Sequence, residues 1–221
     1  MDSLGVLIIA PESDLKNTAD IVAAANGFRV NVLNGYVTGR EALKEIGSGR
    51  YDVVYFGGHE RELDSVTVSD GRLDEEYLRQ ALRSASSGRL QIVILNSCDS
   101  ISMAAALYRA GVAPRVIGWP SEMSDAAAGS WAQNFFRSLA LGAEFWEAFA
   151  SSVEVLRVQF PTVKPPVFLN GRITLLEERV AAIQRQLDER AGMLTVPRWT
   201  LAVLLVLAGL AATATVLALL Q

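Results

Sequence analysis

The chain contains a single histidine and a single cysteine, His59 and Cys98. Each comes shortly after an apolar run typical of a buried strand, the first ending at Phe56 and the second at Leu95. Parallel strands end at a common edge of their sheet, where ligand crevices form. If the two strands are neighbours, an imidazole and a thiol lie within reach, and the imidazole can deprotonate the thiol. The pattern therefore predicts a nucleophilic cysteine with a histidine base.

The same two residues also have a simpler interpretation. An isolated cysteine is most often small buried filler, and an isolated histidine is most often a satisfied loop residue. Cys98 precedes a predicted helix whose N-terminal dipole favours the thiolate, whereas the Asp99 carboxylate opposes it. A lone cysteine cannot form an internal disulfide, which suits a reducing cytosol. The matched positions favour catalysis, and plain packing stays the alternative.

Strand and helix patterns alternate along the chain. Strands are expected at residues 4–10, 28–33, 51–56, 90–95 and 115–118, and helices at residues 15–26, 38–46, 73–84, 101–110, 124–141 and 144–160. Residues 66–68 predict a small hairpin arm. Thr38 and Glu41 match a capping box, and Ser100 is placed to cap the helix from Ile101. This alternation predicts an α/β domain with a doubly wound, mostly parallel sheet covered by helices on both faces.

The chain is expected to form one globular domain with an appendage. Residues 1–160 suffice for one domain, and the segment Pro161–Pro166 marks its end. Residues 161–198 then form a linker and an amphipathic helix, with apolar residues at spacings of four and three at Leu169, Ile173, Leu176, Val180, Ile183 and Leu187. This helix either lies back on the domain or forms a coiled stalk, in which case residues 169–187 join a homo-oligomer.

Residues 199–221 are expected to form a membrane anchor. Thr200–Leu220 holds no charged residue, whereas residues 1–198 carry all the charge. About 21 helical residues rise about 31 Å, close to a hydrocarbon core of about 30 Å. Arg190 and Arg198 precede the segment, which predicts a single-pass tail anchor with the domain in the cytoplasm. Small residues spaced by four would let such helices associate. A buried core helix is the alternative.

Composition excludes several other classes of function. A net charge of −4 and an isoelectric point near 5.1 leave no basic footprint for nucleic acid phosphates. A nucleotide-binding flavodoxin-like domain is a further candidate, but no phosphate-cradling glycine motif follows the first strand. No metal site and no cofactor are predicted.

Several segments together resemble one known family. They are VVYFGGH at 53–59, DGRL at 70–73, IVILNSCDS at 92–100, VIGWP at 116–120, and then Asp125, Phe135-Phe136 and residues 142–148. In order and spacing they are similar to the CHAT branch of the caspase and separase cysteine peptidases, over roughly residues 4–160. The resemblance implies a caspase-like sheet sandwich in which His59 is the general base and Cys98 the nucleophile. It also suggests bacterial stress or phage-defence signalling.

One position departs from that family. Its members usually carry glycine directly after the histidine, and the backbone amide there joins that of the cysteine in the oxyanion hole. Here the residue is Glu60, so the hole would be formed by the amides of Glu60 and Cys98, with a carboxylate close to the developing negative charge. A catalytically impaired scaffold, which recruits a partner and clusters its membrane helix, is therefore the alternative function.

The resemblance also implies which residues form the substrate pocket. They lie in the loop after the first strand, two positions before the cysteine, and in the loop after the last core strand, at Glu12, Asp14, Asn96, Glu122 and Asp125. Most of these residues are acidic, so a protein substrate cleaved after a basic residue is the natural complement. Ordinary surface solvation is the alternative explanation for each carboxylate.

Deleting residues 200–221 should give a soluble, folded protein, because the remaining chain holds all the charge and a complete sheet. Ultracentrifugation of the truncated chain with membranes in high salt checks this. Truncated protein that still pellets with membranes would show that another part of the chain also binds the bilayer.

Overall fold

A computed structural model describes residues 3–11, 15–58, 65–85 and 89–170. The chain divides into two units, and all of these residues belong to the first, Met1–Ile173. The strands are β1 (Gly5–Pro11), β2 (Arg29–Gly35), β3 (Val53–Gly57), β4 (Ser65–Val68), β5 (Gly71–Asp74), β6 (Ile92–Asn96), β7 (Arg115–Gly118) and β8 (Val167–Asn170). The helices are α1 (Leu15–Ala24), α2 (Gly39–Gly47), α3 (Glu75–Ala85), α4 (Ile101–Arg109), α5 (Asp125–Ala140) and α6 (Phe145–Gln159).

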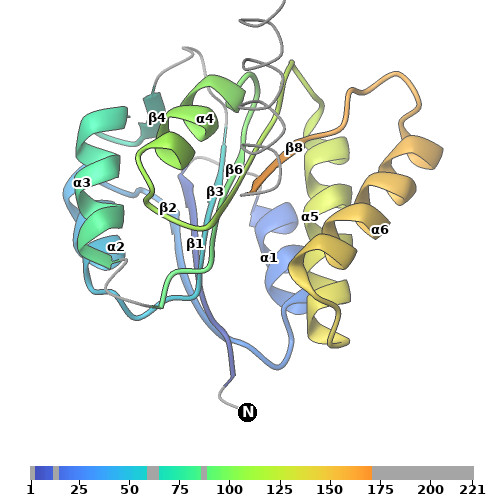
Figure 1. Cartoon of the computed structure of the whole chain (residues 1–221), viewed down its shortest axis with the longest axis horizontal. Helices are drawn as coiled ribbons and strands as arrows, with labels where there is room; N and C mark the ends of the chain where they lie inside the picture. Colours follow the sequence, from blue (N-terminus) through green and yellow to red (C-terminus); the bar gives the residue numbers. More distant parts are fainter. Residues whose placement is uncertain (1–2, 12–14, 59–64, 86–88, 171–221) are drawn as a thin grey trace, which may run out of the picture. The chain divides into compact units, whose positions relative to one another are not determined.

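The main sheet has the strand order β2-β1-β3-β6-β7-β8, and its first five strands run parallel. Helices α2, α3 and α4 cover one face, and α1, α5 and α6 cover the other (Figure 1). The predicted α/β class, with a mostly parallel sheet between helices, is confirmed. The hairpin arm is confirmed as well, since β4 and β5 pair in a separate antiparallel sheet.

Both faces of the sheet are buried, which explains the continuous apolar runs of its central strands. In β3, Val54 and Phe56 join the core under α2, α3 and α4, whereas Val53 and Tyr55 join the core under α1, α5 and α6. Alternate residues of β1 and β6 divide between the two cores in the same way. The side-chain period of two therefore fixes which face each residue near a strand end must enter.

The eighth strand corrects the predicted domain end. Strand β8 pairs antiparallel with β7, with Val116 opposite Leu169, and Leu169 is buried in the core. The sequence pattern alone predicts a domain end at residue 160 and places Leu169 in the stalk helix. A run of three apolar residues after a proline-rich segment fits a short strand as well as the start of a helical seam, and pairing with β7 decides for the strand. The rest of the predicted stalk lies outside the described residues.

None of the described helices is long and apolar enough to cross a bilayer. The predicted anchor at residues 199–221 lies outside the described part of the chain.

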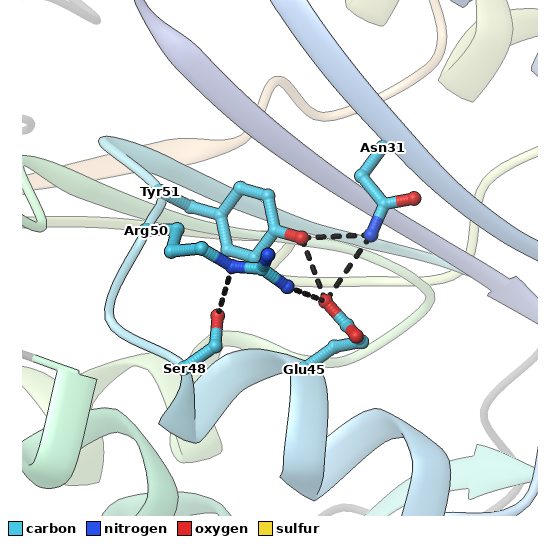
Figure 2. A network of polar contacts seen from close by, with 5 residues as sticks. All are labelled: Asn31, Glu45, Ser48, Arg50 and Tyr51. Atoms are coloured by element: carbon cyan, nitrogen blue, oxygen red, sulfur yellow. Dashed lines mark hydrogen bonds and ion pairs between the residues drawn. The ribbon is translucent and has the colours of Figure 1, made fainter.

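A polar network joins α2 to the open edge of the sheet (Figure 2). The Tyr51 hydroxyl donates to Glu45 Oε2 over 2.7 Å and accepts from Asn31 Nδ2 over 2.7 Å. Arg50 donates to the same Glu45 oxygen from 3.1 Å. Burial raises the pKa of Tyr51 above its ordinary value, and the bond to Glu45 adds to the rise. The neutral phenol is therefore the form that the fold favours.

Replacing Tyr51 by Phe should change how stability depends on pH. The raised pKa means that stability from the neutral phenol is complete below its ordinary pKa of 10.0 and is lost as the pH rises through the folded-state pKa. Tyr51→Phe should therefore cost about 1 kcal/mol at neutral pH, and this difference should shrink at strongly alkaline pH. Urea unfolding of both proteins across that range checks this, and a constant difference would contradict it.

Candidate active site

Cys98 lies just beyond the carboxyl end of a central strand. Strand β6 ends at Asn96, residues 97–100 form a turn, and α4 begins at Ile101. Its neighbour β3 ends with Gly57 paired to Asn96. His59 follows Gly57 by two positions in the sequence, as Cys98 follows Asn96. His59 and Glu60 themselves lie outside the described residues. The structure therefore places the two strand ends side by side and describes the cysteine half of the predicted pair.

The end of β1 reaches the same edge. The Pro11 carbonyl oxygen lies 3.6 Å from where a Cβ on Gly58 would stand. Glu12 and Asp14, predicted to line the pocket, come next in the sequence and lie outside the described residues. The segment that carries them therefore starts next to the segment that leads to His59.

The Cys98 thiol is half-buried and contacts the backbone of Met123. The Met123 N–H donates to Cys98 Sγ over 3.4 Å, and the thiol donates to the Met123 carbonyl oxygen over 3.6 Å. Only the second contact needs the neutral thiol, because a thiolate can still accept a hydrogen bond from the Met123 amide. The loop between β7 and α5 therefore lies directly against the sulfur.

The turn around Cys98 contains an unusual backbone conformation. Asp99 has φ +52°, and among the described residues it is the one non-glycine with positive φ. Its N–H donates to the Ser121 carbonyl oxygen over 3.4 Å. Aspartate is one of the few side chains that visit this left-handed region, which still costs about 1–2 kcal/mol. Such strain is common where a chain must present a functional side chain at a sharp turn.

Ser100 does not cap α4 as predicted. It stands at the N-cap position without a capping side-chain bond, and its side chain is fully buried. Its hydroxyl lies 2.9 Å from the Leu95 carbonyl oxygen and 2.8 Å from that of Ser97, and it accepts the Trp119 N–H over 3.0 Å. A buried hydroxyl is almost always hydrogen-bonded, and here its acceptors are carbonyl oxygens at the turn instead of groups at the start of α4. Ser100 thus ties the Cys98 turn to the end of β7.

Asn96 was predicted to line the substrate pocket, and its side chain is instead part of the core. It is 4% exposed. Its Nδ2 donates to the Tyr55 hydroxyl over 2.7 Å and to the Ala128 carbonyl oxygen over 3.2 Å, and its Oδ1 accepts from Trp119 Nε1 over 2.7 Å. The strand alternation turns this side chain toward α5, and its role in a substrate pocket stays a prediction. Burial also raises the pKa of Tyr55, which keeps that hydroxyl neutral.

Glu122 lies in the loop that contacts Cys98, and Asp125 begins the helix that follows it. Glu122 precedes Met123 and is exposed. Asp125 is the exposed first residue of α5, after Ser124, whose hydroxyl accepts the Ala127 N–H over 3.2 Å. The structure therefore brings both carboxylates within two positions of the residue that contacts the thiol.

Met123, Trp119 and Ser100 were missed as site residues. The contact of Met123 is made by its backbone, so its side-chain type carries no signal. The position of Trp119 was evident in the Trp-Pro pair after β7, but its bond to Asn96 depends on tertiary packing. Within the described residues, no cluster of metal-ligand side chains occurs.

No protein-family model matches the chain, and no curated protein matches its sequence. Among solved structures it is similar to a secreted C11 cysteine protease from Bacteroides thetaiotaomicron, with 10% identity and a TM-score of 0.48. That match covers 72% of this chain and 60% of the protease, so the chain spans less than two thirds of that protein. It is also similar to drICE, with 12% identity, a TM-score of 0.48, and 76% of this chain and 88% of drICE covered.

Two further similar structures have names that do not mention a protease. Protein GSU0716 from Geobacter sulfurreducens is 18% identical with a TM-score of 0.49, over 75% of this chain and 92% of that protein. The pyridoxal kinase from Staphylococcus aureus is 12% identical with a TM-score of 0.40, over 71% of this chain and 87% of the kinase. Caspase-like cysteine proteases thus occur among the structural neighbours. At these TM-scores the likenesses assign neither a family nor a reaction, and function has to be argued from the site.

Ser97→Ala and Ser100→Ala should differ in their effect on the free energy of unfolding. Ser97 Oγ is buried and has no hydrogen-bond partner within the described part of the chain, whereas the Ser100 hydroxyl has several. Removing an unpaired hydroxyl should leave stability unchanged or raise it, and removing Ser100 Oγ should cost about 1–3 kcal/mol. Chemical unfolding of both variants checks this. A marked loss with Ser97→Ala would show that Ser97 bonds to a residue outside the described ranges.

Proposed function

We propose that this chain is a caspase-like cysteine endopeptidase of the CHAT type, with Cys98 as nucleophile and His59 as general base. The observation that carries the proposal is the pairing of Gly57 with Asn96, because each residue precedes one member of the pair by two positions. Neighbouring strands lie about 4.8 Å apart, so side chains that leave their ends are within reach of each other. The half-buried, turn-mounted thiol fits this role better than that of a fully packed core cysteine.

The proposed reaction is acyl transfer through sulfur. His59 takes the proton of the Cys98 thiol, the sulfur attacks the scissile carbonyl carbon, and the same proton passes to the leaving amine. Water then hydrolyses the thioester, with His59 as base. The oxyanion is stabilised by the backbone amides of Glu60 and Cys98. Attack requires Sγ to give up its bond to the Met123 carbonyl, so substrate binding and loop position are linked.

The proposed substrate is a protein cleaved after a basic residue. Glu122 is exposed beside Met123, and Asp125 begins the helix that follows. Glu12 and Asp14 follow Pro11, the last residue of β1, in the sequence. Carboxylates at these positions favour Lys or Arg over an acidic or apolar side chain.

We also propose that residues 199–221 tether the domain to the cytoplasmic side of a membrane as a tail anchor. The support is the uncharged segment Thr200–Leu220, which has the length of one membrane span. The substrate would then be a protein held near the bilayer, and stress or phage-defence signalling is the setting that the family resemblance suggests. Because Leu169 belongs to β8, a self-associating stalk would begin after it, at Ile173.

The second candidate function is a catalytically impaired scaffold. It is favoured by Glu60, which replaces the glycine usual after the histidine and puts a carboxylate beside the proposed oxyanion hole. Small residues spaced by four in the anchor, such as Ala208 and Ala212, would serve to cluster it.

The reactivity of Cys98 with a thiol reagent tests the proposal without knowledge of the substrate. Cys98 should alkylate faster than a free cysteine near neutral pH, and more slowly once His59 is replaced by Ala, because the imidazole favours the thiolate. The chain has no other cysteine, so the rate of iodoacetamide incorporation reports this residue alone. A native thiol that is inert, and equally inert in His59→Ala, would contradict the peptidase and leave the scaffold.

A further inference from the structure

The segment Trp119–Met123 lies along the whole Cys98 turn and is hydrogen-bonded to it at successive positions. The Trp119 N–H donates to Ser100 Oγ over 3.0 Å, and the Ile101 N–H donates to the Trp119 carbonyl oxygen over 2.9 Å. Asp99 bonds to Ser121, and Met123 bonds to Cys98 Sγ. The position of the sulfur contact therefore depends on where this segment, which we call the clasp loop, is held.

The buried end of the clasp loop is Trp119. Its side chain is fully buried and lies edge-on to Trp131, with ring centroids 6.1 Å apart. Its Nε1 donates to Asn96 Oδ1 over 2.7 Å. Gly118, just before it, has no room for a side chain, since a Cβ there would lie 2.6 Å from Ala104 Cβ. The clasp loop therefore begins at Trp119, which is fixed in the core, and ends at Met123, which contacts the thiol.

Asn96 is suited to hold that fixed point. Its amide nitrogen is occupied by Tyr55 and Ala128, which leaves its oxygen facing the indole. The bonds to Tyr55 and Trp119 are buried, where a hydrogen bond is directional and its loss is costly. Asn96 also lies two positions before Cys98, on the strand that carries the thiol. One side chain therefore links the strand that presents the sulfur to the loop that contacts it.

We propose that Asn96 is a positioning residue of the Cys98 site, which through Trp119 holds the clasp loop and its Met123 backbone against the thiol. The inference deepens the proposed function and rests on it for its catalytic meaning. In the resting protein the clasp loop keeps the Met123 backbone on the half-buried Sγ, so the thiol is slowed but stays reactive. The wall of the substrate site is thus set from the core, through a side chain that is 4% exposed.

The matched variants Trp119→Phe and Trp131→Phe test this. Both remove the same indole atoms from fully buried sites in one aromatic cluster. Trp119 Nε1 holds Asn96, whereas Trp131 Nε1 has no hydrogen-bond partner within the described residues. Both should therefore lower the thermal unfolding temperature through lost packing. Only Trp119→Phe should release the clasp loop, and the full chain in detergent micelles should then alkylate at Cys98 about fivefold faster, the factor that one lost hydrogen bond gives.

Equal alkylation rates in the two variants, at equal folded fraction, would overturn the proposal. If Trp119→Phe does not fold, hydrogen exchange of the Met123 amide in the unaltered chain decides, since exchange as fast as in an unstructured peptide would overturn it too. The proposed function fails separately. A normal rate in His59→Ala together with a fast rate in Trp119→Phe would refute the peptidase and keep Asn96 as the anchor of the clasp loop.

Discussion

The parallel pairing of β3 with β6 is the constraint on which the candidate site depends. Its register runs from Val53 opposite Ile92 to Gly57 opposite Asn96, and both strands are central and buried. A shift by one residue would exchange the two faces of a strand and would drive Asn96 away from Tyr55 and Trp119. The positions of the turn at Asp99 and of the contact at Met123 therefore depend on this pairing.

The amino ends of the same strands show how the register is held. The Asp52 carboxylate accepts from the Gly5 N–H over 2.6 Å and from Arg89 Nε over 3.2 Å, while the Asp52 carbonyl accepts from the Gln91 N–H over 2.7 Å. One residue thus ties the starts of β1, β3 and β6. The buried amide of Asn96 performs the corresponding task at the carboxyl edge. Polar side chains at both ends thus add directional hydrogen bonds to an otherwise apolar sheet.

Much of the fold could be predicted because local patterns and tertiary packing agree. Apolar runs marked β1, β3, β6 and β7, and the capping box at Thr38 marked α2. Prediction from the sequence is wrong where a residue bonds to or packs against a residue far away in the chain. Ser100 has the type of a helix cap but bonds the Trp119 backbone, and Leu169 continues a helical spacing but pairs with β7. The buried bonds of Asn96 to Tyr55 and Trp119 likewise have no signal in the sequence. Those outcomes depend on contacts between elements, which the spacing of residues in the sequence does not show.

Cys98 is proposed to attack a peptide carbonyl with the help of His59. The most direct measurement is covalent labelling of the full chain by peptidyl chloromethyl ketones that differ only in a terminal Lys, Asp or Leu, read by intact mass. We expect a single adduct on Cys98, formed fastest with the Lys probe and lost in His59→Ala. Labelling by none of the three probes, while iodoacetamide still modifies Cys98, would contradict the claim, because the thiol would then be accessible but unable to act on a bound peptide.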